Sequence, residues 1–338
     1  MAPKKKGDTP GVGLDLGTMN IVSARRSPEG VETKRMRDAF IDLPISARKM
    51  LALSDASYVE RDGEVFILGD AAMEMANVFG REPRRPLAGG IISPKESDAL
   101  EVLKLLIQHV LGAPSEENEI CFFSVPADPV DQPEQDVIYH RGVFEKIVRE
   151  CGYTPYPSNE AMAIIFSECA LDQFSGVALS FGSGMVNVAL AIQTLEGLSF
   201  SVARSGDWID RGAAKSTGNT QARICAIKEA GVNLLDPKGR EQEAITYYYK
   251  AAIEYALDQI ALRFKMIEGQ FSLPRAIPMV VSGGTSLAGG FLELFLQVFE
   301  RKRKRFPIEI SEVRQAKDPL NSVAYGMLVQ AMQEYNDE

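Results

Sequence analysis

The sequence contains little histidine and little cysteine, and this excludes two kinds of site. Its 338 residues include two histidines, His109 and His140, so a metal site built from several histidines is excluded. None of the four cysteines forms a Cys-x-x-Cys pair, and all lie in apolar or helical-looking stretches. That pattern is typical of reduced thiols in the core of a cytosolic protein. We therefore expect no disulfide framework among Cys121, Cys151, Cys169 and Cys225.

The sequence also lacks an uninterrupted apolar run that is long enough to cross a membrane. The longest uncharged stretch, residues 173–195, is broken by Gly, Ser and Asn and predicts strand–turn–strand instead. No apolar segment follows the basic residues 1–8, so no signal peptide is expected. Lysines 4–6 have the charge to touch an anionic membrane, but without an amphipathic helix a disordered tail is the simpler expectation. We expect a soluble cytoplasmic protein with no membrane insertion.

An excess of positive charge is absent as well. Lys and Arg number 37 against 46 Asp and Glu, which gives a formal net charge of -9. A net-acidic chain is a poor general binder of nucleic acid, so we expect no such partner. The basic run 301–305 (RKRKR) has two interpretations, a contact with an acidic partner or neighbouring subunit, and, more simply, a solvated helix end. The length, more than twice that of a domain of about 150 residues, favours two lobes.

The chain repeats its opening segment. Residues 11–18 read GVGLDLGT, and residues 176–183, about half the chain away, read GVALSFGS. Each copy is a short apolar run that ends in a turn of small residues and is followed by a second apolar run. This pattern predicts a β-hairpin. Two such hairpins half a chain apart indicate two lobes of one duplicated design.

Turns of this kind are suited to binding phosphate. Glycines let backbone N–H groups converge on an anion, and Thr18 or Ser183 adds a hydroxyl donor. Asp15, between strand and turn, is placed to hold hydrated Mg²⁺ against the phosphates. A tight hairpin without a ligand is the alternative for either copy alone, because short glycine-rich patterns are common. The occurrence of two copies in register favours phosphate binding.

Strands and helices alternate through the rest of the chain, as in an α/β protein. Helical spacing of apolar residues predicts helices at 70–78, 97–111, 134–150, 161–170, 220–231, 241–267, 291–298 and 322–334. Short apolar runs predict strands at 65–68, 119–125, 276–282 and 308–310. Residues 34 to about 95 otherwise predict a small α+β insertion. A third small-residue turn, Gly283-Gly284, either approaches a ligand closely or simply starts a helix.

Seven motifs follow one another in a known order. They are DLGT (15–18), SNEAMA (158–163), GSG (182–184), GDWID (206–210), IKE (227–229), SGGT (282–285) and SVAYG (322–326). The order resembles that of the superfamily of ATP-binding proteins that includes actin, heat-shock chaperones and sugar kinases. The resemblance covers nearly the whole chain. Its length, its insertion and residues 69–75 (GDAAMEM) are most similar to bacterial actins of the MamK and MreB type.

The resemblance implies an α/β, duplicated, ribonuclease-H-like (actin-like) fold of two lobes with a nucleotide cleft between them. Lobe I comprises residues 1–170 with an inserted subdomain at about 34–95. Lobe II comprises 171–320 with a helical inserted subdomain at about 213–274, and residues 321–338 form a C-terminal helix that returns to lobe I. Segments 159–160 and 324–326 correspond to the hinge, where hydrolysis changes the angle between the lobes.

The resemblance also implies roles for single residues, with ATP or ADP and Mg²⁺ as cofactors. Asp15 would hold the metal, and Glu229 would accept a hydrogen bond from a ribose hydroxyl. The two phosphate loops would comprise Gly17, Thr18, Met19 and Asn20, and Gly182, Ser183 and Gly184. The adenosine-binding residues would be Lys228, Glu229, Gly283, Gly284, Thr285, Ser286, Leu287 and Ala288. ATP is expected rather than GTP only because of the resemblance.

The second phosphate motif departs from the family pattern. The family begins it with Asp, whereas this chain has Ser180, and the nearby Asn187 is also neutral. Because phosphoryl transfer depends on metal positioning and charge neutralisation, we expect slow hydrolysis but retained binding. Family members place a water-orienting polar residue on the helix after a segment that reads SVPA here (124–127). The competing residues are Asp131, Gln132, Glu134, Gln135 and Asp136.

Among these, Glu134 or Gln135 is favoured as catalytic, with a solvated acidic helix start as the alternative. The function expected first is an ATP-binding cytoskeletal protein that forms head-to-tail filaments and is compatible with adaptor proteins. A nucleotide-binding scaffold or regulator with little ATPase activity is the alternative. The fold alone does not decide between these functions, because it also serves kinases. A kinase of the same superfamily, with Asp207 or Asp210 as its catalytic aspartate, is a further alternative, but the actin-like segments fit the sequence better.

Overall fold

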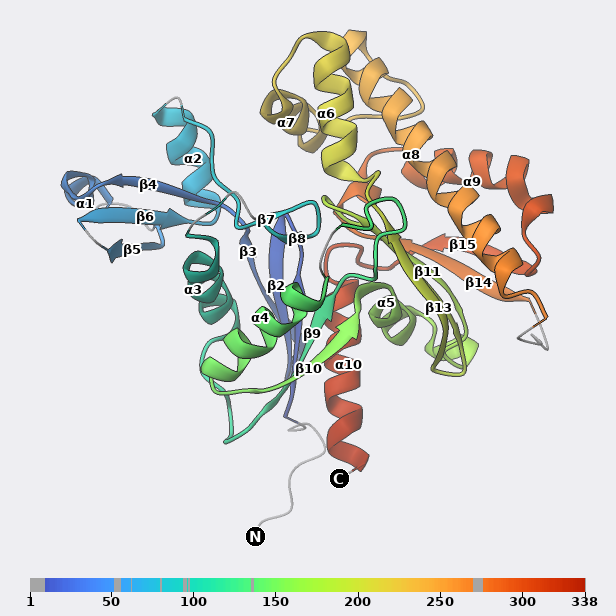
Figure 1. Ribbon diagram of the computed structural model, residues 1–338, viewed down its shortest axis with the longest axis horizontal. Helices are drawn as coiled ribbons and strands as arrows, with labels where there is room; N and C mark the ends of the chain where they lie inside the picture. The colour runs from blue at the N-terminus through green and yellow to red at the C-terminus, as the bar shows by residue number, and fades with distance from the viewer. Residues whose placement is uncertain are drawn as a thin grey trace.

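The computed structural model describes residues 10–51, 56–61, 63–79, 81–93, 96, 98–134, 137–269 and 276–337. In this part of the chain two five-stranded sheets lie side by side, with helices between and around them (Figure 1). The first sheet has the order β10-β9-β1-β2-β3. Strands β1, β9 and β10 are parallel, and β2 and β3 return antiparallel. The bounds are β1 Val12–Leu16, β2 Asn20–Ser27, β3 Gly30–Arg37, β9 Ile120–Val125 and β10 Thr154–Asn159.

The second sheet repeats this arrangement with the order β13-β12-β11-β14-β15. Strands β11, β14 and β15 are parallel, and β12 and β13 are antiparallel to their neighbours. The bounds are β11 Gly176–Phe181, β12 Val186–Ile192, β13 Leu195–Val202, β14 Ile277–Ser282 and β15 Ile310–Gln315. The shared topology confirms the predicted duplication and the two-lobed α/β fold.

The alternation of side chains along β1 and β11 explains where Asp15 and Ser180 lie. Leu14 of β1 belongs to the apolar core under the helices of lobe I, and Leu179 of β11 to the core of lobe II. Successive side chains of a strand point to opposite faces. Asp15 and Ser180, the next residues along, therefore lie on the inner faces of the two sheets, which border the space between the lobes.

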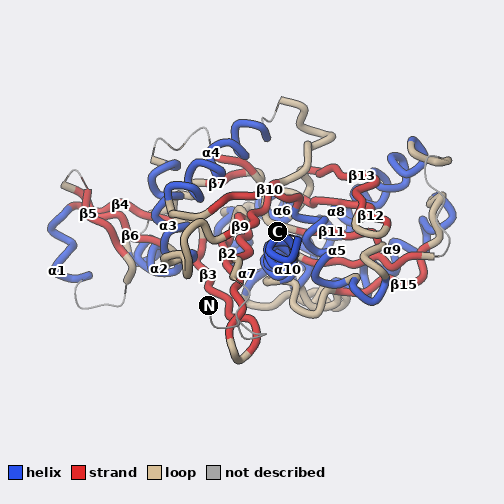
Figure 2. Tube along the Cα trace, turned by 90° about the horizontal axis from the view of Figure 1, so that it is seen from below, coloured by secondary structure: helices blue, strands red, loops and turns tan. Residues whose placement is uncertain are grey.

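Two helices fill the space between the sheets. Helix α5 (Glu160–Glu168) packs on the second sheet, α10 (Ser322–Asp337) packs on the first, and the two helices contact each other (Figure 2). A Cβ atom on Gly326 would lie 1.8 Å from the carbonyl oxygen of Ala163, and one on Gly13 would lie 2.1 Å from that of Ala324. Glycine is therefore required where α10 crosses α5 and where it crosses β1.

The inserted segment of lobe I forms a small sheet with its own core. Its sheet has the order β4-β6-β5, and a separate hairpin pairs β7 with β8. The guanidinium of Arg84 joins the insertion to the lobe, because it donates to Asp42, Glu96 and Asp98 at 2.8–2.9 Å. The elements are β4 Phe40–Pro44, η1 Ile45–Ala47, α1 Arg48–Leu51, β5 Tyr58–Arg61, β6 Glu64–Leu68, α2 Asp70–Val78, β7 Leu87–Ala88 and β8 Ile91–Ile92.

Helices cover the outer faces of both sheets. The outer face of the first sheet shares its core with α3 and α4, and that of the second with α8 and α9. Helices α6 and α7 pack on the first half of the long α8 (Figure 1). The bounds are α3 Ala99–Leu111, α4 Val137–Glu150, η2 Ala170–Asp172, α6 Gly206–Thr217, α7 Gln221–Glu229, α8 Gly239–Met266, η3 Gly284–Leu287, α9 Phe291–Lys302 and η4 Arg303–Arg305.

Most predicted elements are confirmed, but the bounds of the strand expected at 308–310 are wrong. The strand is β15, which begins at Ile310 and continues through polar residues to Gln315. Its C-terminal part was not predicted because those residues are polar and partly exposed at the edge of the sheet and carry no apolar signal. The helix expected at 134–150 is described from Val137, since residues 135–136 lie outside the described part.

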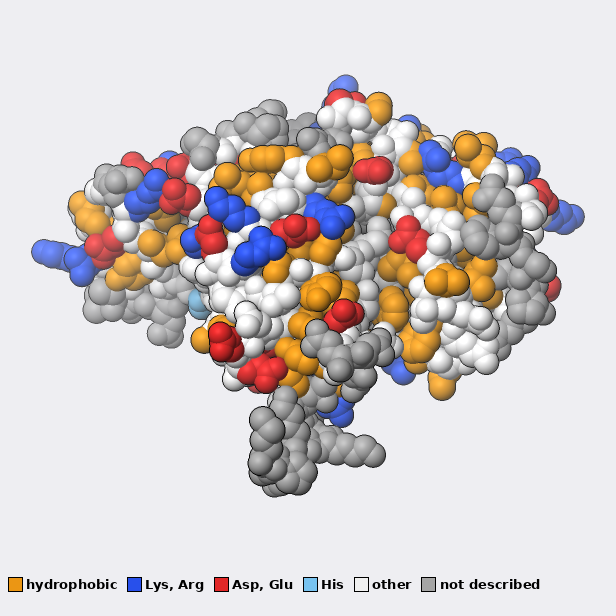
Figure 3. Space-filling model, turned by 60° about the horizontal axis from the view of Figure 1, so that its bottom comes forward, with side chains coloured by type: hydrophobic (Ala, Val, Ile, Leu, Met, Phe, Trp, Pro, Cys, Tyr) orange, Lys and Arg blue, Asp and Glu red, His pale blue; other side chains and the backbone are white. Residues whose placement is uncertain are grey.

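The basic run at residues 301–305 ends α9 as an ion-paired surface. Lys302 and Arg305 both contact Asp258 of α8, at 2.6 and 3.1 Å, and Arg301 contacts Glu254 at 3.4 Å. Figure 3 shows a face of the molecule on which charges of both signs are mixed with apolar side chains. All four cysteines are free thiols. Among the described helices, none combines the length and the apolar character that a membrane span requires.

Candidate functional site

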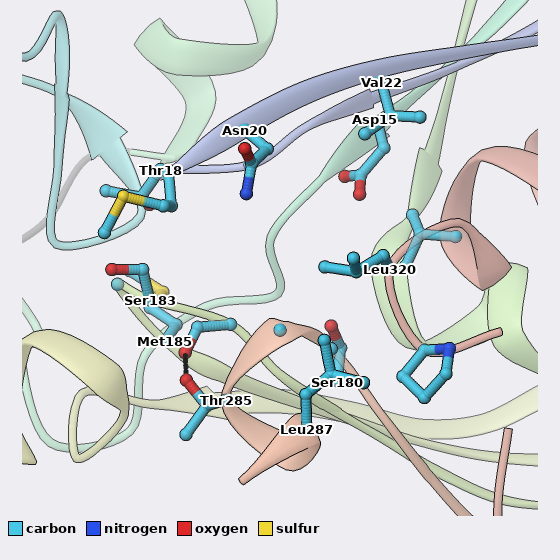
Figure 4. Close-up of a pocket in the computed structure, with 18 of the residues that line it drawn as sticks. Asp15, Thr18, Asn20, Val22, Ser180, Ser183, Met185, Thr285, Leu287 and Leu320 are labelled. Atoms are coloured by element: carbon cyan, nitrogen blue, oxygen red, sulfur yellow. Dashed lines mark hydrogen bonds between the residues drawn. The ribbon is translucent and has the colours of Figure 1, made fainter. Parts of the chain in front are cut away.

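A cavity of about 570 Å³ lies between the two lobes. Its walls come from the β1–β2 and β11–β12 turns, the end of β3, the start of α5, the end of α7 and the turn after β14 (Figure 4). Both copies of the repeated hairpin therefore border one space. The volume lies within the range of small-molecule sites, which is roughly 300–1,000 Å³.

The first turn contributes Gly17, Thr18, Met19 and Asn20, and all four residues line the cavity. A Cβ atom on Gly17 would lie 2.7 Å from the carbonyl oxygen of Asn20, so a larger residue would open the turn. The carbonyl of Met19 accepts a hydrogen bond from the backbone N–H of Asp38 at 2.9 Å. This bond ties the turn to the start of the inserted segment.

The second turn contributes Gly182, Ser183 and Gly184, which also line the cavity. Its shape is fixed by lobe II, because the carbonyl of Gly182 accepts hydrogen bonds from the Thr285 hydroxyl at 2.8 Å and from the backbone N–H of Gly206 at 3.2 Å. The Ser183 hydroxyl donates to Asp207 at 2.7 Å.

The two turns face each other at short range. A Cβ atom on Gly184 would lie 2.6 Å from the hydroxyl oxygen of Thr18 and 2.2 Å from the backbone nitrogen of Gly90. Gly90 belongs to the β7–β8 turn of lobe I, so two segments of lobe I contact the second turn directly. Glycine at position 184 is what permits this close approach.

Asp15 is the acidic side chain that β1 presents to the cavity. The Ser124 hydroxyl donates to its carboxylate at 3.0 Å and accepts from the backbone N–H of Leu16 at 2.8 Å. Burial raises the pKa of Asp15, and the hydrogen bond from Ser124 opposes that shift. The end of β9 thus orients the carboxylate that the sequence assigned to the metal.

Glu160, the first residue of α5, supplies a second carboxylate to the same cavity. The Asn187 amide donates to it at 2.9 Å, while the amide oxygen of Asn187 accepts from the backbone N–H of Ala127 at 2.9 Å. Burial raises the pKa of Glu160, the negative charge of Asp15 raises it further, and hydrogen bonds from Asn187 and Ser180 oppose the shift. The neutral Ser180 therefore contacts a carboxylate instead of providing one.

The wall predicted to bind the nucleoside contains two ion pairs. Lys228 lines the cavity and contacts the buried Asp210 at 2.7 Å. Glu229, the last residue of α7, also lines the cavity and contacts Arg37 of lobe I at 3.0 Å. Both residues line the cavity, and both are already held by a partner.

The turn after β14 completes this wall with Gly283, Gly284, Thr285, Leu287 and Ala288. Ser286 does not line the cavity, which corrects its prediction. Its side chain is buried beneath the turn, where the hydroxyl donates to the carbonyl of Gly283 at 2.7 Å and the backbone carbonyl accepts from Gln315 at 2.7 Å. A serine in a single turn of 3₁₀-helix points inward or outward according to register, and the motif alone does not reveal which.

Of the two residues favoured to orient water, Glu134 lies exposed in a turn and is absent from the cavity lining. Gln135 lies outside the described residues. The chain after β9 runs along the edge strand β13, where Asp131 accepts from the backbone N–H of Ala203 at 3.0 Å. Asp131, one of the five residues that could have oriented water, therefore binds the chain just after β13 instead. Glu134 follows it on the surface.

Several lining residues were not assigned to the site from the sequence. Glu160 was assigned to the hinge only, although its position directly after the helix cap Asn159 was a usable signal. Others come from β3, the β7–β8 turn, α7 and the turn after it, α8, the turn before α9 and the segment before α10, and no local pattern marks them. They include Arg35, Arg37, Gly90, Cys225, Gly231, Tyr249, Gly289, Pro319 and Leu320.

The donor set at the centre of the cavity suits a magnesium ion that is shared with a ligand. Within the described ranges, no group of three or more His, Cys, Asp or Glu side chains is placed to hold a metal. Asp15 and Glu160 are two carboxylates beside the glycine turns, and burial raises the pKa of both. Mg²⁺ is usually held by one or two carboxylates together with phosphate oxygens and water, so these residues fit that ion.

Two lobes of one topology, joined through α5 and α10 and facing each other through paired glycine turns, define the actin-like fold. Within this class the chain belongs to the volactin family, whose model matches residues 11–331. No curated protein matches the chain.

Solved structures share the fold over almost the whole chain. A MamK double helical filament is 17% identical and covers 97% of this chain and 98% of its own, with a TM-score of 0.73. MreB 5 of Spiroplasma citri bound to AMPPNP is 17% identical over 97% and 98%, with a TM-score of 0.67. The ethanolamine utilization protein EutJ from Carboxydothermus hydrogenoformans is 16% identical over 94% and 89%, with a TM-score of 0.55. The expected similarity to MamK and MreB is thus confirmed for the fold.

Proposed function

We propose that the protein binds ATP with Mg²⁺ in the cavity between its lobes and assembles into head-to-tail filaments. The observation that carries the proposal is the pair of glycine turns that face each other across the cavity, with Asp15 and Glu160 beside them. Backbone N–H groups of such turns bind phosphate. The turns at 17–20 and 182–184 would hold the phosphates, and Glu229, Gly283, Gly284, Leu287 and Ala288 would contact the nucleoside.

The two carboxylates have different roles in this proposal. Asp15, oriented by Ser124, would hold the metal ion. Glu160, held by Asn187, would orient the attacking water and accept its proton. When bound, Mg²⁺ supplies charge neutralisation at the phosphates. Because Ser180 adds no charge beside Glu160, hydrolysis would be slow, as we expected from the sequence.

Filament formation is supported by the fold and by two solved structures of similar proteins. One neighbour was solved as a double helical filament, and another is a non-polymerising MamK mutant bound to AMPPNP. Subunits that add head to tail without closing a ring produce filaments. Asp207 and Asp210, the candidate bases of a sugar kinase, contact Ser183 and Lys228. Neither lines the cavity, so the kinase alternative is not favoured.

Electron microscopy of the purified protein with and without ATP and Mg²⁺ tests the proposal, with phosphate release measured on the same sample. We expect filaments that require nucleotide, together with slow release of phosphate. Tight ATP binding without filaments and without turnover would favour the second candidate, a nucleotide-binding scaffold, which the neutral Ser180 supports. Absence of ATP binding would contradict both.

A further inference from the structure

Arg37 connects three parts of the molecule at the nucleoside end of the cavity. It is the last residue of β3 and lines the cavity. Its guanidinium donates to both carboxylate oxygens of Glu229 in lobe II, at 3.0 and 3.5 Å, and to Asp70 at the start of α2 at 3.2 Å. One terminal nitrogen also lies 3.3 Å from the sulfur of Met19 in the first turn. One side chain thus joins both lobes and the inserted subdomain.

The chemistry of this contact limits the freedom of Glu229. The Glu229 side chain is 44% exposed at the end of a helix, so without a partner it would sample several rotamers in water. Arg37 itself is largely covered, at 19% exposed. A planar guanidinium that binds both oxygens of a carboxylate fixes its orientation as well as its position. The carboxylate has about four lone-pair sites, so it retains acceptor capacity for a ligand hydroxyl.

We propose that Arg37 is a positioning residue that orients Glu229 to accept hydrogen bonds from the ribose hydroxyls of the bound nucleotide. The inference rests on the proposed binding of ATP and adds the residue that gives the site its preference for ribose. Because Arg37 reaches across from lobe I, Glu229 is oriented only when the lobes are close together. Recognition of the sugar and closure of the cleft therefore depend on one ion pair.

The chain offers a matched control in Arg35. Arg35 lies two residues earlier on β3, so its side chain leaves the same face of the strand, and it lines the same cavity. It is exposed, and within the described part of the chain it forms no ion pair. Removal of Arg35 takes away the same charge from the same mouth of the cavity. The two variants differ in the contacts of Arg37 with Glu229, Asp70 and Met19, of which only Glu229 is proposed to contact the ribose.

Calorimetric titration with ATP and with 2′,3′-dideoxy-ATP, both in the presence of Mg²⁺, tests the proposal. We expect the wild-type protein to prefer ATP by about tenfold, since a hydrogen bond to a charged acceptor is worth about a factor of ten in affinity. Arg37→Ala should reduce this preference to less than about threefold, and Arg35→Ala should retain it. Arg37→Lys, which keeps the charge but loses the planar fork, should fall between them.

The possible results separate a failure of the inference about Arg37 from a failure of the proposed ATP binding. Equal preference for ATP in Arg37→Ala and Arg35→Ala overturns the inference and leaves the proposed function intact, as does a wild-type protein that binds both nucleotides equally well. A wild-type protein that binds neither nucleotide overturns the proposed function and this inference with it. Circular dichroism melting curves of the variants show whether each is folded, and the ratio of two affinities measured on one variant is insensitive to a uniform loss of active protein.

Discussion

The two glycine turns share one backbone design but differ in the charge beside them. In lobe I, β1 ends with Asp15, whose carboxylate is oriented by Ser124. In lobe II, the same position of β11 is Ser180, and the carboxylate comes instead from Glu160 at the start of α5. The duplication preserved the path of the chain and the alternation of side chains. The charge at the second turn is supplied from a helix that packs between the lobes.

The supports of the two turns differ as well. The first turn is tied by a backbone bond from Asp38 to Met19. The second is held by side chains of its own lobe and by the close approach of Gly90 from the β7–β8 hairpin of lobe I. That hairpin is itself held by buried side chains, since Asp38 accepts from the N–H of Leu87 and His140 from that of Ile92. Contact between the lobes is therefore built into the second turn.

The largest expected effect comes from neutralising the first turn. Asp15→Asn should reduce Mg²⁺-dependent phosphate release by more than about 100-fold, since even the outer-shell partners of a bound metal are worth 10- to 100-fold. The equivalent change in the second turn, Ser180→Ala, removes one hydrogen bond and should alter the rate by no more than about threefold. Phosphate release from both variants checks the comparison. Similar rates of phosphate release for Asp15→Asn and Ser180→Ala would show that the side chains beside the two turns contribute equally to hydrolysis.

A loss of nearly the same size is expected at Glu160. Glu160→Gln keeps the size and the contact with Asn187 but removes the proton acceptor, so phosphate release should fall about 100-fold, the lower end of the range for general base catalysis. Affinity for ATP should change little. Glu134→Gln is the matched control and should leave the rate unchanged, because Glu134 lies outside the cavity lining. A reversed result would restore Glu134 as the residue that orients water.

Restoring charge to the second turn should have a moderate effect in the opposite direction. Ser180→Asp should increase phosphate release by roughly threefold to tenfold, because it adds a carboxylate near the phosphates. It should also lower the melting temperature of the protein without nucleotide, since a third buried carboxylate then lies beside Glu160 and Asp15. Thermal melts with and without ATP and Mg²⁺ measure both effects. An unchanged turnover rate would mean that Ser180 does not limit hydrolysis.

The smallest expected effect concerns the hairpin that touches the second turn. Burial raises the pKa of Asp38 to about 8, and one of its oxygens is buried without a partner in the described part of the chain. Since the folded-state pKa lies above the unfolded value, the stability that the protonated group confers is complete below about pH 4 and is lost as the pH rises towards 8.

Asp38→Asn removes this loss and keeps an acceptor for Leu87. The amount by which its melting temperature exceeds that of the wild type should be smallest near pH 4 and should grow by a few degrees towards pH 8. Thermal melts at the two pH values measure the difference. A difference that does not grow with pH would show that Asp38 is ionised at neutral pH in the folded protein.

The sequence predicts the features that depend on residues close together in the chain, and it does not predict those that depend on how distant segments come together. The hairpins, helix α2 and the two-lobed fold follow from periodicity and from the repeated motif, and Gly17, Gly182 and Gly283 line the cavity as expected. Arg37 reaches the cavity from the end of β3 and Gly90 from the β7–β8 turn, and neither position carries a periodic signal. Glu134 was favoured because it follows β9 in the chain, whereas Glu160 follows β10 and reaches the cavity through the sheet order.

The most direct test of the account is a structure of the protein with Mg²⁺ and a non-hydrolysable ATP analogue. The account predicts the triphosphate between residues 17–20 and 182–184, the metal on the side of Asp15, and Glu160 within reach of a water molecule at the terminal phosphate. A nucleotide bound elsewhere, or a triphosphate that contacts only one of the two turns, would contradict it.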